Sequence, residues 1–263
     1  TGQRYRTDKA LLLQAGFLHQ EGYHLYAKRT WDYEVTAAER LADILKDPAL
    51  PVMEIPKELR AGDIPLSEQQ REAVELALNS RLSVILGGAG SGKTTLIEAI
   101  ARCFKDNADL FGGTVLAAPT GKAARNLTER TGIEARTVHG ALGKSPDANF
   151  LDAVSWNCIG LVVVDEASMV GNSSADAVAF GTGRLLDDLV HYVYSGTNCR
   201  LILLGDTAQL PPVGFDESPA LDSGVLSAYG LGVYRFTLTD VVRQGSDSGV
   251  LCNATRLRNA IAA

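Results

Sequence analysis

One stretch of the sequence carries residues whose types and spacing suit phosphate chemistry. Residues 87–94, Gly-Gly-Ala-Gly-Ser-Gly-Lys-Thr, fit the pattern G-x-x-x-x-G-K-[ST]. Glycines let the backbone wrap closely around phosphate oxygens, in dihedral angles that a Cβ would penalise. The free N–H groups of the turn and of the following helix then point at the anion. We therefore predict a nucleotide-phosphate site formed by Gly87, Gly88, Ala89, Gly90, Ser91, Gly92, Lys93, Thr94 and Thr95.

Two side chains at the end of this loop have chemical roles to play. Lys93 would bridge the terminal phosphates, and the hydroxyl of Thr94 would hold Mg²⁺. The competing interpretation is a tight turn rich in small residues. The loop, however, follows an apolar run at 82–86 and precedes a helical pattern from Leu96, which is the context that the phosphate motif requires.

A pair of carboxylates follows another apolar run, at residues 161–164. Asp165 would hold Mg²⁺, and Glu166 would orient or deprotonate an attacking water. A solvated loop or a helix cap is the ordinary alternative for an Asp-Glu pair. The phosphate loop upstream favours the functional interpretation.

Other polar side chains leave more than one interpretation open. Lys122 lies in the first turn of a predicted helix, where a cation is unfavourable beside the macrodipole. Its side chain could therefore contact a nucleic-acid phosphate, or it could simply be solvated. Gln70 could read an adenine edge or be an ordinary surface amide. His139 by itself is typical of a satisfied core histidine. Gln209 could bridge the γ-phosphate region and a second surface, and Arg243 could supply positive charge to the γ-phosphate.

The elements that must position these residues are continuous apolar runs separated by helical patterns. Such runs indicate parallel strands that helices cover on both faces, so we predict an α/β fold with a parallel sheet of five or more strands. In open α/β sheets, ligands bind outside the carboxyl ends of the strands, where the polar residues above occur. The predicted strands are residues 82–86, 114–118, 161–164, 201–204 and 234–238, with helices at 66–78, from 96, at 121–130 and within 174–194.

The N-terminal part shows a different pattern. Helical spacing at 8–21 and 36–45, with a short strand possible at 23–27, predicts a small, mainly helical region. Four prolines between 47 and 65 indicate a linker, so we place a boundary near residue 62 and expect domains at 1–62 and 63–263. For the aromatic residues of this N-terminal part, we favour a role in core or interface packing over stacking on bases.

Composition excludes few classes of function. The chain is 46% hydrophobic and 21% charged, which is ordinary for a globular protein, and it has no apolar run long enough for a membrane. The net charge of −6 neither supports nor excludes nucleic-acid binding, because a local basic groove can lie on an acidic body. Its four dispersed cysteines indicate reduced thiols of a cytoplasmic protein.

Taken in order, several stretches of residues 64–263 resemble the superfamily 1 helicases, and among them the RecD-like branch that moves 5′ to 3′ on single-stranded DNA. Besides the phosphate loop, these stretches are residues 66–70 (the Q motif), 118–124 (Ia), 137–139 (Ib), 164–169 (II), 205–214 (III) and 238–244 (IV). The resemblance implies a RecA-like P-loop NTPase domain that binds ATP and Mg²⁺.

The resemblance also implies roles for particular residues. Gln70 would recognise adenine, Gln209 would couple the nucleotide state to the grip on DNA, and Arg243 would contact the γ-phosphate. Residues 143–157 would be the insertion that the family uses as a strand-separating pin. The residues that would line the DNA track are Pro119, Thr120, Lys122, Thr137 and His139.

One part of the family pattern is missing. The helicases carry a second RecA-like domain that closes on the nucleotide with an arginine finger, and we expect that domain to lie outside residues 1–263. The resemblance thus implies an ATP-dependent DNA helicase fragment, whose partners are single-stranded DNA and that second domain. Because arginine fingers contribute orders of magnitude in rate, we expect the chain alone to hydrolyse ATP poorly. The alternatives are an RNA helicase of the same superfamily and a non-motor P-loop ATPase that acts as a switch.

Overall fold

The computed structural model describes residues 9–28, 30–31, 35, 50–88, 90–107, 112–143, 159–172, 183–196 and 198–239. Contacts within the chain divide it into two compact units, Thr1–Asp47 and Pro48–Ala263. The boundary therefore falls earlier in the chain than the one near residue 62 that the proline content indicated.

The smaller unit contains a helical segment and a β-hairpin. Residues 9–14 are helical, and the antiparallel strands β1 (Leu18–Glu21) and β2 (His24–Ala27) follow. The expected helix over 8–21 is thus wrong in its second half, where the chain turns at Gly16 with a positive φ of 74° and enters a strand. The short strand expected at 23–27 is present. The predicted helix at 36–45 lies outside the described residues.

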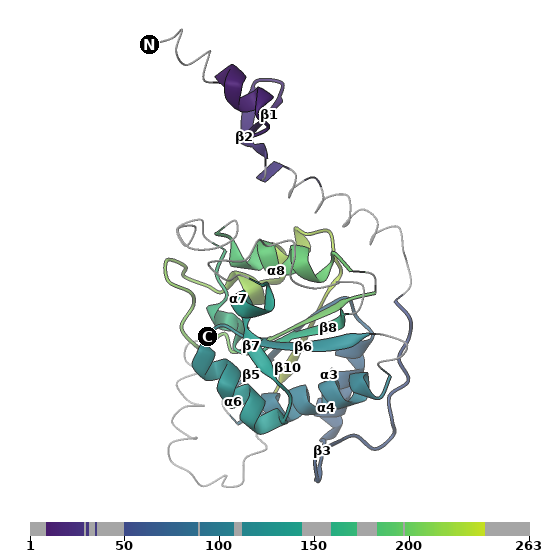
Figure 1. Cartoon of the computed structure of the whole chain (residues 1–263). Helices are drawn as coiled ribbons and strands as arrows, with labels where there is room; N and C mark the ends of the chain where they lie inside the picture. Colours follow the sequence, from purple (N-terminus) through teal and green to yellow (C-terminus); the bar gives the residue numbers. More distant parts are fainter. Residues whose placement is uncertain are drawn as a thin grey trace. The chain divides into compact units, whose positions relative to one another are not determined.

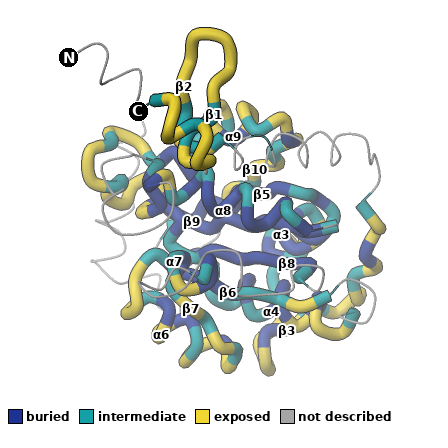
Figure 2. Tube along the Cα trace, turned by 45° about the horizontal axis from the view of Figure 1, so that its top comes forward, coloured by how far each residue is buried: buried dark blue, intermediate teal, exposed yellow. Residues whose placement is uncertain are grey.

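Three aromatic rings pack together in the smaller unit. His19 stacks on Trp31 with ring centroids 4.3 Å apart, and Tyr26 lies 4.9 Å from the same indole. The tip of the hairpin is exposed, as Figure 2 shows. Stacked and tilted ring contacts of this kind stabilise the packing of these three side chains.

The segment expected to be a linker belongs to the larger unit. Met53 is 2% exposed and lies in the hydrophobic core, and the short antiparallel pair β3 (Arg60–Ala61) and β4 (Ile64–Pro65) follows. Arg200 is fully buried and donates from Nη2 to the carbonyl of Pro51 at 2.9 Å. This segment therefore forms a strap on the domain, because Met53 is buried in the core and Ile55 and Leu59 pack partly buried against it.

The larger unit is built on a six-stranded parallel sheet within the described residues. Its strand order is β10-β5-β9-β8-β6-β7, with every neighbouring pair parallel. The strands expected from the apolar runs are all present, and the sheet is as large as predicted. The strands are β5 (Leu82–Gly87), β6 (Gly113–Ala118), β7 (Ala135–Thr137), β8 (Ile159–Val164), β9 (Arg200–Gly205) and β10 (Val233–Leu238).

Helices cover both faces of this sheet (Figure 1). On one side lie α3 (Glu68–Leu78), α4 (Lys93–Lys105) and α6 (Gly121–Thr131); α7 (Val138–Ala141) and α8 (Leu185–Val193) lie on the other. Strands β5 and β9 are buried along their whole length, which explains why their sequences are continuously apolar rather than alternating. Figure 2 shows this buried centre in dark blue.

Short elements complete the domain after the last buried strands. They are the 3₁₀ turns η2 (Ala167–Met169) and η4 (Pro219–Leu221) and the helix α9 (Ser223–Ser227). Cys103 and Cys199 are buried, and the thiol of Cys199 donates to the carbonyl of Ile159 at 2.8 Å. Among the described helices, none combines the length and hydropathy that a bilayer crossing needs.

Candidate nucleotide-binding site

The phosphate loop connects the end of β5 to the first turn of α4. Gly90 and Gly92 have positive φ angles of 85° and 80°, which side chains other than glycine rarely adopt. Gly87 is needed for a second reason, because a Cβ there would collide with the hydroxyl of Ser91. That hydroxyl donates to the carbonyl of Gly88 at 2.9 Å and closes the turn. The loop thus has the compact shape that lets N–H groups surround an anion.

Lys93 and Thr94 begin α4 directly after this loop. The Lys93 ammonium donates to the carbonyl of Gly87 at 2.6 Å and lies 3.4 Å from that of Gly88, so it extends across the loop. Thr94 and Thr95 are half-buried in the first helical turn. At a helix N-terminus, the free N–H groups and the macrodipole add to the positive charge of the lysine.

The carboxylates follow β8, two strands away from β5 at the same edge of the sheet. The N–H of Asp165 donates to the carbonyl of Ala117 at 2.9 Å, which fixes the end of β8 against β6. The carboxylate of Asp165 accepts from the N–H of Glu166 at 2.9 Å. Glu166 has a positive φ of 53°, a conformation that costs a residue with a Cβ about 1 kcal/mol or more and that clusters at functional sites.

Burial raises the pKa of the Asp165 carboxyl, and the charge of Glu166 adds to this effect. The charges of Lys93 and Arg130 oppose it. A bound cation would favour the ionised form in the same way, because it compensates for the lost solvation.

A cavity of about 170 Å³ joins these groups to α6. Asp165, Glu166 and Thr94 line it, and Asn126 and Arg130 face it from α6. Sequence reasoning gave Asn126 and Arg130 no role. Asn126 and Arg130 follow Ala123 at the helical spacing that places residues on one face, and Ala123 lines the same cavity. This spacing was the signal in the sequence that could have identified them.

The donor set of this cavity fits a hydrated magnesium ion. Carboxylate and hydroxyl oxygens are the ligands that Mg²⁺ prefers, and it keeps several of its waters in most protein sites. The Oε2 atom of Glu166 is buried and has no hydrogen-bond partner among the described residues. A buried carboxylate oxygen without a partner is costly, so its position favours a ligand or water that completes it. In the described part of the chain, no group of three or more His, Cys, Asp or Glu residues forms a metal cluster.

Gln209 comes from the loop after β9, the strand between β5 and β8. Its Oε1 atom accepts a hydrogen bond of 3.1 Å from the hydroxyl of Ser168, which is 1% exposed. Asp206 holds the same loop by accepting from the N–H of Ala208 at 3.0 Å. The structure therefore connects Gln209 to the turn that carries Glu166. Ser168 is a third residue to which the sequence alone assigned no role.

The side chain of Gln70 is 2% exposed, so it is not the surface amide that remained an alternative. Its Oε1 accepts from the N–H of Ser67 at 3.0 Å, while the hydroxyl of Ser67 accepts from the N–H of Gln70, forming a capping box at the start of α3. The Nε2 atom of Gln70 is buried without a partner among the described residues. A donor of this kind remains available for a ligand.

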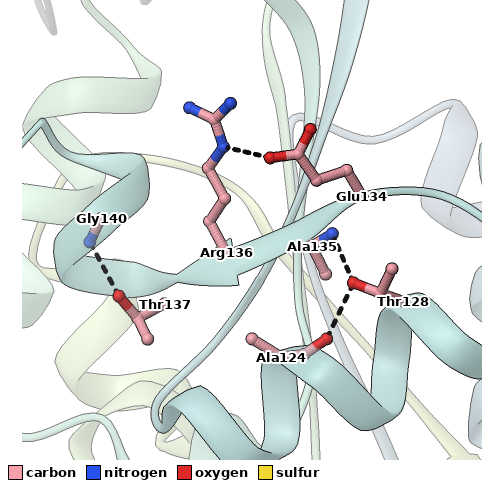
Figure 3. Close-up of polar contacts among 7 residues, drawn as sticks. All are labelled: Ala124, Thr128, Glu134, Ala135, Arg136, Thr137 and Gly140. Atoms are coloured by element: carbon pink, nitrogen blue, oxygen red, sulfur yellow. Dashed lines mark hydrogen bonds and ion pairs between the residues drawn. The ribbon is translucent and has the colours of Figure 1, made fainter.

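The remaining predicted residues lie at or just after the carboxyl ends of β6 and β7, at the same edge of the sheet; Figure 3 shows one of them, Thr137. Thr120 caps α6 by accepting from the N–H of Ala123 at 3.2 Å, and Thr137 caps α7 by accepting from the N–H of Gly140 at 2.9 Å. Thr128 ties α6 to β7, since its hydroxyl donates to the carbonyl of Ala124 and accepts from the N–H of Ala135. Lys122 is exposed, and Pro119 and His139 are half-buried.

Three predicted features lie outside the described residues. They are Ala89 of the phosphate loop, Arg243, and the insertion proposed as a pin apart from Gly143.

A phosphate loop after one strand of a parallel sheet, with an Asp-Glu pair at the carboxyl end of another, defines the RecA-like class of P-loop NTPases. A family model described as an AAA domain matches residues 70–215. The chain therefore belongs to the AAA domain family. Membership of this family implies nucleotide binding.

Named relatives agree with this placement. The chain is 37% identical over 202 residues to an ATP-dependent RecD2 DNA helicase of Deinococcus radiodurans, a match that covers 75% of this chain and 24% of the relative. It is 31% identical over 261 residues to a RecBCD enzyme subunit RecD of Mycobacterium tuberculosis, covering 86% and 42%. The chain thus spans less than half the length of these curated relatives.

A solved structure supports the fold. The crystal structure of the Pif1 helicase from Candida albicans matches with a TM-score of 0.53 and 24% identity, over 73% of this chain and 44% of that one.

Proposed function

We propose that the chain is the first motor domain of an ATP-dependent DNA helicase, which binds ATP with Mg²⁺ and moves along single-stranded DNA together with a second RecA-like domain. The observation that carries this proposal is the convergence of residues from separate strands at one edge of the sheet. Lys93 follows β5, Asp165 and Glu166 follow β8, and Gln209 follows the strand between them. The curated relatives that are named as DNA helicases supply the choice of substrate.

In this proposal the loop N–H groups and Lys93 hold the β- and γ-phosphates of ATP. Thr94 and Asp165 would hold Mg²⁺, which neutralises phosphate charge when it is bound. Glu166 would orient the attacking water and accept its proton. Lys93, which lies across the loop, would turn its ammonium toward the phosphates, since charge-assisted hydrogen bonds to phosphate are stronger than those to carbonyls.

Ser168 would transmit the nucleotide state to the loop after β9. Glu166 begins the turn that contains Ser168, and the Ser168 hydroxyl donates to Gln209. A shift of Glu166 toward a bound nucleotide would therefore move Gln209. Met169 and Leu210 on these two segments are 49% and 85% exposed, so they are placed to report that movement to a partner surface.

The single strand would pass over the loops that follow β6 and β7. Lys122 and Arg125 are exposed on α6, and Arg136 is exposed on β7. By contrast, the cavity of about 670 Å³ beside Gln209 is lined by Asp216 and Glu217 among others, and this negative charge would repel a phosphate backbone.

Binding of a fluorescent single-stranded DNA, followed by anisotropy across a salt series, tests this path. We expect affinity to fall as salt rises, and Lys122→Ala to weaken binding and reduce the salt slope by about 1. Lys105→Ala, at the far end of α4, is the matched control and should leave the slope unchanged. Equal affinity of wild type and Lys122→Ala at every salt concentration would contradict the path. An RNA strand of equal length in competition tests the choice of DNA.

A further inference from the structure

Two residues far apart in the sequence are joined beside the phosphate loop. The Nε2 atom of Gln69 donates to the hydroxyl of Thr239 at 2.8 Å, and the N–H of Thr239 donates back to the Oε1 atom of Gln69 at 3.0 Å. Gln69 lies in the first turn of α3, and Thr239 is the residue directly after β10. The single amide therefore uses both of its functions to hold the end of this edge strand.

The end of β10 lies directly against the phosphate loop. Leu238 pairs with Gly87 in the parallel register of β10 and β5. A Cβ built on Gly87 would lie 3.3 Å from the Cβ of Leu238, so there is little space between the two backbones. The carbonyl of Gly87 is also the acceptor of the 2.6 Å hydrogen bond from Lys93.

These contacts form a continuous chain from α3 to the lysine of the loop. Gln69 holds Thr239, the preceding residue Leu238 abuts Gly87, and Gly87 is the first residue of the loop, whose carbonyl accepts from Lys93 in the free protein. Closely packed neighbours transmit small displacements, because protein interiors have few voids that could absorb them.

We propose that Gln69 is a positioning residue for the nucleotide site, which acts by fixing the end of β10 against Gly87. The inference rests on the proposed function, in which the loop binds the phosphates of ATP. It separates the roles of two consecutive glutamines. The amide of Gln70 is buried and caps its own helix, whereas the amide of Gln69 connects that helix to Thr239, the residue after β10.

Substitutions at the two positions remove the contacts in graded steps. Gln69→Ala removes both hydrogen bonds. Thr239→Val removes only the hydroxyl, because the backbone N–H remains to donate to Gln69. Gln69→Glu keeps both bonds, since a carboxylate accepts from the N–H and from the hydroxyl alike. Glu75→Ala, an exposed change on the same helix, is the matched control.

Isothermal titration with an ATP analogue that resists hydrolysis, in the presence of Mg²⁺, measures the effect on the site. We expect Gln69→Ala to weaken binding by about 3- to 10-fold, the range for loss of one net hydrogen bond. Thr239→Val should fall between Gln69→Ala and wild type, while Gln69→Glu and Glu75→Ala should stay within about 2-fold of wild type.

Hydrogen exchange of the free protein gives a second readout that needs no nucleotide. Amides of residues 85–94 should exchange faster in Gln69→Ala and at the wild-type rate in Gln69→Glu. Unchanged affinity and exchange in Gln69→Ala, or a failure of Gln69→Glu to restore them, would overturn the inference while leaving the proposed function intact. A wild-type chain that does not bind the analogue would refute the proposed function and this inference with it.

Discussion

Replacement of Arg200 by methionine should destabilise the domain without changing its affinity for nucleotide. Arg200 begins β9 and is fully buried, and its guanidinium donates to the carbonyls of Leu78 at 2.6 Å, Pro51 at 2.9 Å and Asn198 at 3.1 Å. Burial, followed by the charge of Arg81, lowers the pKa of Arg200 to about 10, so the group stays protonated at neutral pH.

The size of the effect follows from these contacts. Each hydrogen bond to a charged group contributes about 1.5–3 kcal/mol, and methionine leaves the acceptors in a buried site without their donor. Removing the charge recovers part of this loss, because a buried guanidinium is itself poorly solvated. We therefore expect a net loss of about 3 kcal/mol in the free energy of unfolding. For a domain of this size, such a loss lowers Tm by roughly 6–12 °C.

Urea denaturation followed by circular dichroism measures this loss, with Arg125→Met as the control because Arg125 is exposed on α6. Since Arg200 lies at the opposite end of β9 from the loop that carries Gln209, the affinity of the folded variant for an ATP analogue should equal that of wild type. The strap should also become accessible to protease near Pro51. A variant as stable as wild type within about 0.5 kcal/mol would refute the reasoning.

Three further predictions concern other contacts. Burial raises the pKa of the Cys199 thiol to about 11 from 9.0, so the unfolded chain loses the thiol proton at a lower pH than the folded chain does. The contribution of this thiol to the free energy of unfolding is therefore fully present below pH 9 and falls by roughly 2 kcal/mol as pH rises to 11. Cys199→Ser should remove this part of the alkaline dependence in denaturation curves. Ser168→Ala and Gln209→Ala should show a coupling of about 0.5–1 kcal/mol in a double-mutant cycle of unfolding, and additive effects would contradict their hydrogen bond. Arg130→Ala should strengthen Mg²⁺ binding several-fold by removing a cation near the carboxylates, whereas Arg125→Ala should not; titration with Mg²⁺ in the presence of nucleotide distinguishes them.

The sequence predicted the centre of the sheet because its strands are buried on both faces. Residues of β5 and β9 have no exposed side to alternate with, so their apolar runs are continuous and easy to recognise. The phosphate loop was equally easy to recognise, because its glycines allow backbone dihedral angles that residues with a Cβ rarely adopt. Because ligands bind outside the carboxyl ends of parallel strands, Asp165 and Gln209 were predicted to lie at one edge of the sheet.

Features that depend on tertiary contacts could not be predicted in this way. Strand β7 is three residues long and has no buried residue, so it lacks an apolar run. The segment around Met53 contains several prolines, and only its burial in the core distinguishes a strap from a linker. The contact of Gln69 with Thr239 joins residues 170 positions apart, and nothing in either local pattern indicates the other.

The convergence of the strand ends on one nucleotide is tested most directly by titration of an ATP analogue with and without Mg²⁺. The account predicts that Lys93→Ala weakens binding by about 10- to 100-fold under both conditions, because a charge-assisted contact is lost. Asp165→Asn should abolish only the gain in affinity that Mg²⁺ confers. If Lys93→Ala binds as tightly as wild type, or Asp165→Asn keeps the full response to Mg²⁺, these residues do not share one site and the account is contradicted.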